Sequence, residues 1–127
     1  MPRTIHTDDA PAAVGPYSQA ATDGSLLFTA GQIALTPDGD DLTDLSPAEQ
    51  AKQCLANLEA VLAAEGLDFS DVLKTTVYLD EIEDYAAVND VYAEYFEAEP
   101  PARSAVAVHA LPKGAAVEIE AIASLHD

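Results

Sequence analysis

The feature that most constrains the fold is a one-sided helix in the middle of the chain. Residues 46–66 read SPAEQAKQCLANLEAVLAAEG, with Ser46 as N-cap, Pro47 in the first position, Glu49 completing a capping box and Gly66 as the C-terminal stop. The apolar residues of this helix recur at spacings of three and four: Ala51, Cys54, Leu55, Leu58, Val61 and Leu62. They form one apolar face, which therefore has to cover a sheet.

Strand-like segments surround this helix and a second amphipathic helix. β-rich or alternating runs are predicted over 26–35, 71–80, 103–111 and about 116–125, and the second helix over 84–96. Residues 8–24 contain Pro11, Gly15 and Pro16, which predict an ordered loop. The order of strands, helix, strand, helix and strands predicts an α+β fold with two layers. Both helices should lie on one face of a mixed, about six-stranded sheet.

The length and the apolar content predict one domain over residues 1–127. The chain starts without the apolar run of a signal peptide, and no stretch approaches the roughly 20 apolar residues of a membrane span, so we expect a cytoplasmic protein without a membrane partner. Cys54 is the single cysteine, which excludes an internal disulfide and a cysteine zinc site. Its place on the apolar stripe predicts a buried core residue rather than a reactive thiol.

The net charge of −18 narrows the possible partners. With 23 carboxylates against 5 lysines and arginines, the chain would repel the phosphate backbone of a nucleic acid, so we expect no nucleic-acid partner. The acidic residues gather in predicted turns and on exposed helix surface, which suggests a protein from a salt-accumulating halophile. The histidines, His6, His109 and His126, are too scattered to indicate a metal site.

Arg103 stands out because cations are scarce. Alternation in its strand puts Arg103 on the same face as Ala105, Ala107 and His109. Small neighbours leave room for a recessed guanidinium to bind a carboxylate or a phosphate in a bidentate fork. The alternative is a structural ion pair with one of the many carboxylates, and the spacing does not choose between the two.

Other polar residues lie where a site could use them. Glu118 and Glu120 share one face of the last strand. Glu120 lies between two apolar neighbours, and a carboxylate in such surroundings can have a raised pKa, although spacing alone does not choose between the two glutamates. Asn89 lies on the apolar stripe of the second helix, where it either bonds neighbouring backbone or lines a pocket. If the last two strands formed a hairpin, Glu120 and Arg103 would lie roughly 14 Å apart. Either the pairing differs, or a site that uses both forms between subunits.

Five motifs in the right order resemble the Rid (YjgF-like) family, specifically the RidA-type enamine/imine deaminases. They are GPYSQA at 15–20, TAGQI at 29–33, the helix with Asn89, PPARSAV at 100–106 and EIEAIA at 118–123, and the resemblance runs from Thr4 to Ser124. It implies a chorismate-mutase-like fold and a homotrimer with clefts between subunits. It also implies hydrolysis of 2-aminoacrylate-type enamines, or their imines, to 2-keto acids and ammonia without cofactor or metal.

The resemblance also implies a role for each site residue. Arg103 would grip the carboxylate of the small 2-imino or enamino acid, and Tyr17 and Asn89 would shape the cleft. The carbonyl group of Gly31 would meet the substrate nitrogen or a water. Glu120 would position and help to activate the attacking water.

At two positions the chain departs from the family pattern. Ala105 replaces a frequent cysteine, although its backbone N–H can still bond the substrate carboxylate, and Ala30 replaces a common serine whose hydroxyl would donate near the cleft. The competing interpretation is a non-catalytic trimer that binds small carboxylates or acts as a chaperone-like surface. Ribonuclease activity or inhibition of translation, attached to some relatives, fits the charge of −18 worst.

Overall fold

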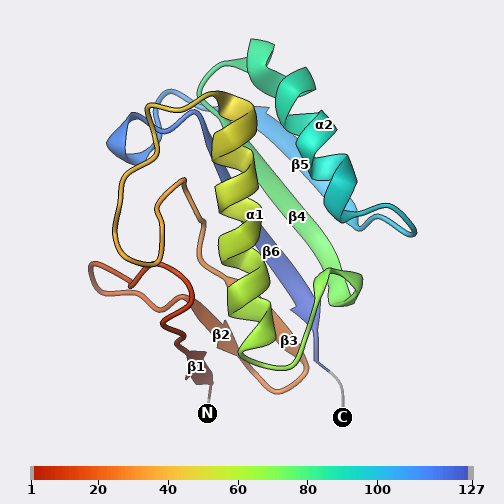
Figure 1. Cartoon of the computed structure of the whole chain (residues 1–127). Helices are drawn as coiled ribbons and strands as arrows, with labels where there is room; N and C mark the ends of the chain where they lie inside the picture. Colours follow the sequence, from red (N-terminus) through yellow and green to blue (C-terminus); the bar gives the residue numbers. More distant parts are fainter. Residues whose placement is uncertain (1, 126–127) are drawn as a thin grey trace.

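The computed structural model describes residues 2–125, and it has two helices on one face of a six-stranded sheet (Figure 1). The predicted α+β fold in two layers is confirmed. The helices are α1 (Pro47–Ala63) and α2 (Tyr85–Tyr95), with short 3₁₀ turns η1 (Phe69–Asp71), η2 (Ile82–Asp84) and η3 (Pro112–Gly114). The strands are β1 (Arg3–Ile5), β2 (Ala20–Thr22), β3 (Leu26–Thr29), β4 (Val72–Leu79), β5 (Ala102–Ala107) and β6 (Val117–Ser124).

The sheet has the order β1-β2-β3-β6-β4-β5, so a hairpin between the last two strands is the wrong pairing. Strand β4 separates them: β5 runs parallel to β4, and β6 runs antiparallel to it on its other side. The chain returns through α2 to lay β5 beside β4, and the backbone N–H of Val108 extends that pairing by donating to the Leu79 carbonyl at 2.8 Å. Residues 108–116 then cross to the other side of β4 instead of making a tight turn.

The predicted strand over residues 26–35 is shorter than expected. Regular pairing ends at Thr29, and beyond it the backbone pairs with β6 through an isolated bridge between Gln32 and Ile119. Gly31 lies at the point of departure, where the carboxyl group of Glu118 occupies the space that a side chain would need. Close approach of a neighbouring side chain explains this glycine.

Helix α1 forms as the sequence predicts. The Ser46 hydroxyl accepts a hydrogen bond from the backbone N–H of Glu49 at 3.2 Å, and Gly66 takes a φ of +72° just beyond the helix. The carboxylate of Glu49 bonds the Ser46 hydroxyl, so the capping box is only half formed. All six residues of the apolar stripe are fully buried. Burial raises the pKa of the Cys54 thiol, in keeping with a core residue.

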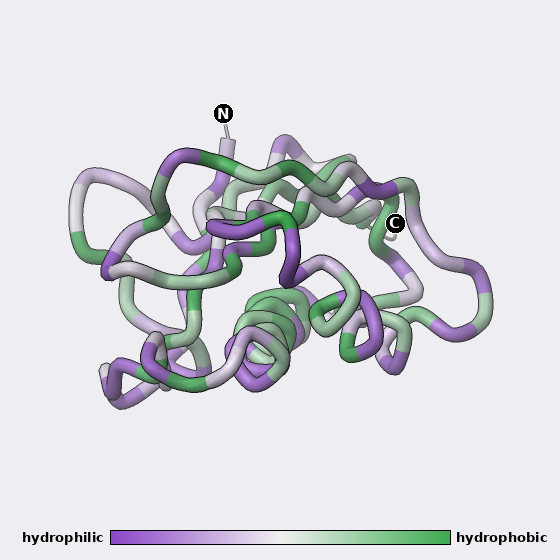
Figure 2. Tube along the Cα trace, turned by 90° about the horizontal axis from the view of Figure 1, so that it is seen from above, coloured by the Kyte–Doolittle hydropathy of each residue, from purple (hydrophilic) through white to green (hydrophobic). Residues whose placement is uncertain are grey.

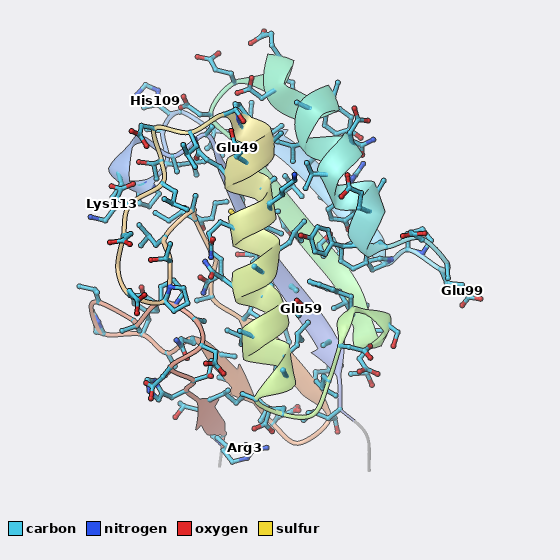
Figure 3. The ribbon with its side chains drawn as sticks, viewed as in Figure 1. Arg3, Glu49, Glu59, Glu99, His109 and Lys113 are labelled. Atoms are coloured by element: carbon cyan, nitrogen blue, oxygen red, sulfur yellow. The ribbon has the colours of Figure 1, made fainter. Side chains whose placement is uncertain are left out.

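The two layers are visible end-on in Figure 2, with α1 below the sheet and hydrophilic segments in the outer turns. Charged side chains such as Arg3, Glu59, Glu99 and Lys113 lie on the outside of the molecule (Figure 3). Within residues 2–125, none of the helices combines the length and the apolar character that crossing a membrane would require.

Candidate functional site

Arg103 lies on the edge strand β5 and points under helix α2. It is paired with Thr75 of β4, whose side chain is buried beneath the helices. One guanidinium nitrogen, Nη1, donates to Oδ1 of Asn89 at 2.8 Å, and Nη2 donates to the hydroxyl of Tyr85 at 2.5 Å. The guanidinium carbon is 4.7 Å from the ring centroid of Tyr92 and 5.4 Å from that of Tyr85. Three residues spaced four and three apart on α2 therefore hold the arginine.

These contacts show which partners Arg103 and Asn89 have within the chain. Across residues 2–125, the guanidinium of Arg103 makes no ion pair with a carboxylate, so it is not half of a structural salt bridge. The amide oxygen of Asn89 accepts a hydrogen bond from Arg103. A small pocket surrounds the arginine, and it is lined by Asn89 and Ala105 together with Val77, Tyr85, Val88 and Tyr92. Among residues 2–125, the groups that bond the guanidinium of Arg103 are therefore neutral, although the chain has 23 carboxylates.

A second group of polar side chains lies on the opposite face of the sheet, which no helix covers (Figure 1). The carboxylate of Glu120 accepts a hydrogen bond from the Tyr78 hydroxyl at 3.2 Å. Glu118 is partly buried against Gly31, where an added Cβ would lie only 2.0 Å from Oε2 of Glu118. Burial, and after it the charge of Glu120, raises the pKa of Glu118 above its ordinary value.

The sheet separates these two groups within one chain. Arg103 and Thr75 share the helix-covered face with Ala121, which is buried. Because side chains alternate along a strand, Glu118 and Glu120 point to the other face. One small molecule cannot touch Arg103 and either glutamate of the same chain, although the strand pairing differs from a hairpin.

The loop before β2 carries Tyr17. The buried amide of Gln19 organises this loop, because its Nε2 donates to the Pro11 carbonyl at 2.8 Å and its Oε1 accepts from the backbone N–H of Thr7 at 2.7 Å. The backbone N–H of Ala30 donates to the Gln19 carbonyl at 2.9 Å. Tyr17 is 55% exposed and is absent from the residues that line the pocket of Arg103.

Sequence reasoning missed Tyr85 and Tyr92 as parts of the arginine site. Both tyrosines lie on the helix face that carries Asn89, yet Tyr85 is 39% exposed and bonds Arg103. Their spacing around Asn89 was the available signal, since residues at i, i+4 and i+7 share one helix face. An amide between two tyrosines on that face indicates a polar partner there.

The histidines do not form a cluster in the part of the chain that the structure describes. His6 contacts Asp8 at 3.1 Å, and His109 is exposed beyond the end of β5 rather than on the strand with Arg103. His126 lies outside the described residues. No group of three or more potential metal ligands occurs within residues 2–125.

Comparison with known proteins places the chain in a family. The family model described as Endoribonuclease L-PSP matches residues 7–125. A 2-iminobutanoate/2-iminopropanoate deaminase from Capra hircus is 50% identical, over 95% of this chain and 88% of its own length. Two Escherichia coli crystal structures are similar, each covering 98% of this chain and 99% of the other: the YjgF gene product, with a TM-score of 0.91 and 44% identity, and TdcF with bound serine, with a TM-score of 0.92 and 40% identity.

These matches extend over nearly the whole chain, and the similar crystal structures agree with the two-layer fold. In both crystal structures the structural similarity is accompanied by sequence identity of 40% or more over 98% of this chain. The chain belongs to the YjgF/Rid family, which the matching model describes as Endoribonuclease L-PSP.

Proposed function

We propose that the protein hydrolyses small 2-imino and 2-enamino acids to 2-keto acids and ammonia, as a 2-iminobutanoate/2-iminopropanoate deaminase. The observation that carries the proposal is Arg103, which is held by Asn89 and two tyrosines and has no carboxylate partner within residues 2–125. A guanidinium held in this way suits the carboxylate of such a substrate. The relatives named as deaminases support the same reaction.

The reaction needs a water that attacks the C=N carbon and a group that moves its proton. A glutamate carboxylate accepts one proton from the water as the new C–O bond forms and the C=N π electrons move to nitrogen, and it returns that proton to the nitrogen. The same carboxylate then moves the hydroxyl proton of the resulting carbinolamine to the nitrogen, so that C=O forms while the C–N bond breaks and ammonia leaves. A carboxyl group with a raised pKa suits both proton transfers near neutral pH.

Two glutamates are candidates for this role. The resemblance assigns it to Glu120, whose carboxylate bonds Tyr78. The surroundings favour Glu118, because its carboxyl group packs against Gly31, whose carbonyl is the proposed partner of the substrate nitrogen or of the water. The raised pKa of Glu118 also supports this choice.

The proposed site forms between subunits of a homotrimer. Arg103 and the two glutamates lie on opposite faces of one sheet, so a neighbouring subunit has to supply one group. Strand β5 is the last strand of the sheet and leaves an edge unpaired within the chain, which is a natural place for a second copy to pack. Tyr17, exposed on its loop, could reach the cleft of a neighbour in the same way.

A coupled assay in molar KCl tests the proposal. A serine or threonine dehydratase generates the enamine, and the disappearance of the enamine is followed with wild-type protein, Arg103→Ala and Arg3→Ala. The Arg3→Ala variant is the control, because it removes an arginine that is paired with Glu65. We expect wild type and Arg3→Ala to accelerate the loss and Arg103→Ala to be inactive. No acceleration by a folded wild type would reject the enzyme and leave carboxylate binding as the function.

Cleavage of RNA, which the name of the family model suggests, is a poor match to this chain. With a net charge of −18, its surface repels polyphosphate chains at ordinary ionic strength. The Arg103 pocket is also small and is enclosed largely by aromatic and aliphatic side chains. A substrate with one carboxylate suits this pocket better than a polynucleotide.

A further inference from the structure

Tyr85 occupies a special place beside Arg103. It is the first residue of α2, is 39% exposed, and its oxygen lies 2.5 Å from Nη2 of the arginine. Because a guanidinium can only donate, the Tyr85 oxygen is the acceptor in this bond. The hydrogen of the Tyr85 hydroxyl is therefore not used in the contact with Arg103.

Tyr92, the other tyrosine of the pocket, uses its hydroxyl in a contact away from Arg103. The Tyr92 hydroxyl is 2.7 Å from Oγ1 of Thr75 in a buried contact, so only its ring faces the guanidinium. Helix α2 thus offers Arg103 one tyrosine whose ring stacks on it and one whose O–H donates to no group among residues 2–125. A guanidinium has five N–H groups, and the bonds to Asn89 and Tyr85 leave others free for a carboxylate.

A carboxylate that accepts from Nη2 of Arg103 would lie next to the Tyr85 oxygen. The hydroxyl hydrogen can then turn toward the anion and form a charge-assisted hydrogen bond, which is stronger than one between neutral groups. The Tyr85 oxygen is polarised further because it already accepts from a cation. Arginine and tyrosine would together form a two-residue carboxylate clamp.

We infer that the Tyr85 hydroxyl is a direct ligand of the substrate carboxylate, beside Arg103, and that it makes this site selective for carboxylate-bearing imines. The inference rests on the proposed function. It adds a substrate-binding group on α2 and gives Tyr85 a role separate from core packing.

The test compares Tyr85→Phe with Tyr95→Phe, which removes a hydroxyl from the same helix outside the pocket of Arg103. The coupled assay gives KM and kcat, and titration with pyruvate, a stable 2-keto acid, gives Kd. For Tyr85→Phe we expect KM and the pyruvate Kd to rise about tenfold or more with kcat changed less than about threefold, as for loss of a bond to a charged group. Tyr95→Phe should match wild type.

A second variant separates direct contact from mere support of Arg103. Replacing Tyr85 with 3-fluorotyrosine makes the phenol a better donor and a poorer acceptor, measured at a pH where it stays protonated. A hydroxyl that donates to the carboxylate should bind pyruvate more tightly after fluorination. Weaker or unchanged binding would overturn the inference, because a hydroxyl that only accepts from Arg103 gains nothing.

The outcomes for Tyr85 and for the deaminase proposal can be told apart. Wild-type protein that hydrolyses imines alongside an unaffected Tyr85→Phe variant rejects the clamp and leaves the reaction intact. Wild-type protein that binds pyruvate through Tyr85 but does not hydrolyse imines rejects the deaminase and keeps the clamp. Absence of both hydrolysis and pyruvate binding rejects both.

Discussion

At the scale of single residues, the two glutamates of β6 differ through their neighbours. Glu118 packs against Gly31, and burial and the charge of Glu120 raise its pKa, whereas Glu120 accepts a bond from Tyr78. A raised pKa means that the folded protein favours the protonated form of Glu118. Its contribution to stability is therefore present at low pH and is lost as the pH rises through the folded-state pKa.

This difference predicts opposite effects of Glu118→Gln on stability and on activity. At neutral pH the neutral amide removes the cost of a partly buried charge, so the Tm should rise, while deamination should fall by about 100-fold or more if Glu118 moves the proton. Glu120→Gln is the matched control and should retain more activity. The coupled assay measures the activity of both variants, and thermal melts at pH 5 and pH 7 measure their stability. A larger loss of activity in Glu120→Gln than in Glu118→Gln would indicate that Glu120 moves the proton.

At the scale of elements, the local features of this fold were predictable and the distant pairings were not. The N-cap Ser46 and the glycine stop Gly66 act within a few residues, so α1 follows from its own sequence. The strand that pairs with β5 depends on the path of the chain after α2. The alternation of side chains along β5 is the same whether the strand belongs to a hairpin or to a parallel pair, so it does not reveal the partner. The contact of Gly31 with Glu118 joins residues far apart in sequence, and no local pattern encodes it.

A buried side-chain amide on α1 also joins segments that are distant in sequence, and its contribution to stability can be predicted from its hydrogen bonds. Gln50 is 2% exposed; its Nε2 donates to the carbonyls of Thr43 and Leu45 at 3.0 and 2.8 Å, and its Oε1 accepts from the backbone N–H of Ala116 at 2.9 Å. Gln50→Ala would leave these backbone groups without their partner, and we expect a loss of about 2–4 kcal/mol in urea unfolding. Lys52→Ala, exposed on the same helix, should stay within about 0.5 kcal/mol of wild type; equal effects would contradict this role.

At the scale of the whole molecule, ion pairs offset little of the repulsion between the many carboxylates. Among residues 2–125, the pair of Arg3 and Glu65, at 2.7 Å, is the one ion pair made by a lysine or an arginine. Self-repulsion at a net charge of −18 destabilises the compact state, and salt screens it. We expect a higher Tm in molar KCl than in low-salt buffer, with most of the gain lost after neutralising Asp38 and Asp40 together with other exposed carboxylates. A Tm independent of salt would count against a halophilic origin.

The proposed site requires the homotrimer, because Arg103 and Glu118 of one chain lie on opposite faces of its sheet. If one subunit supplies the arginine and its neighbour supplies the glutamate, inactive Arg103→Ala and Glu118→Gln chains should complement each other after unfolding and refolding as a mixture. Random assembly of equal amounts would restore about a quarter of the sites, since each intact site needs one particular chain on either side. Each variant refolded alone is the control, and sedimentation confirms that the mixture has assembled. A mixture that assembles and stays inactive would contradict a site shared between subunits through Arg103 and Glu118.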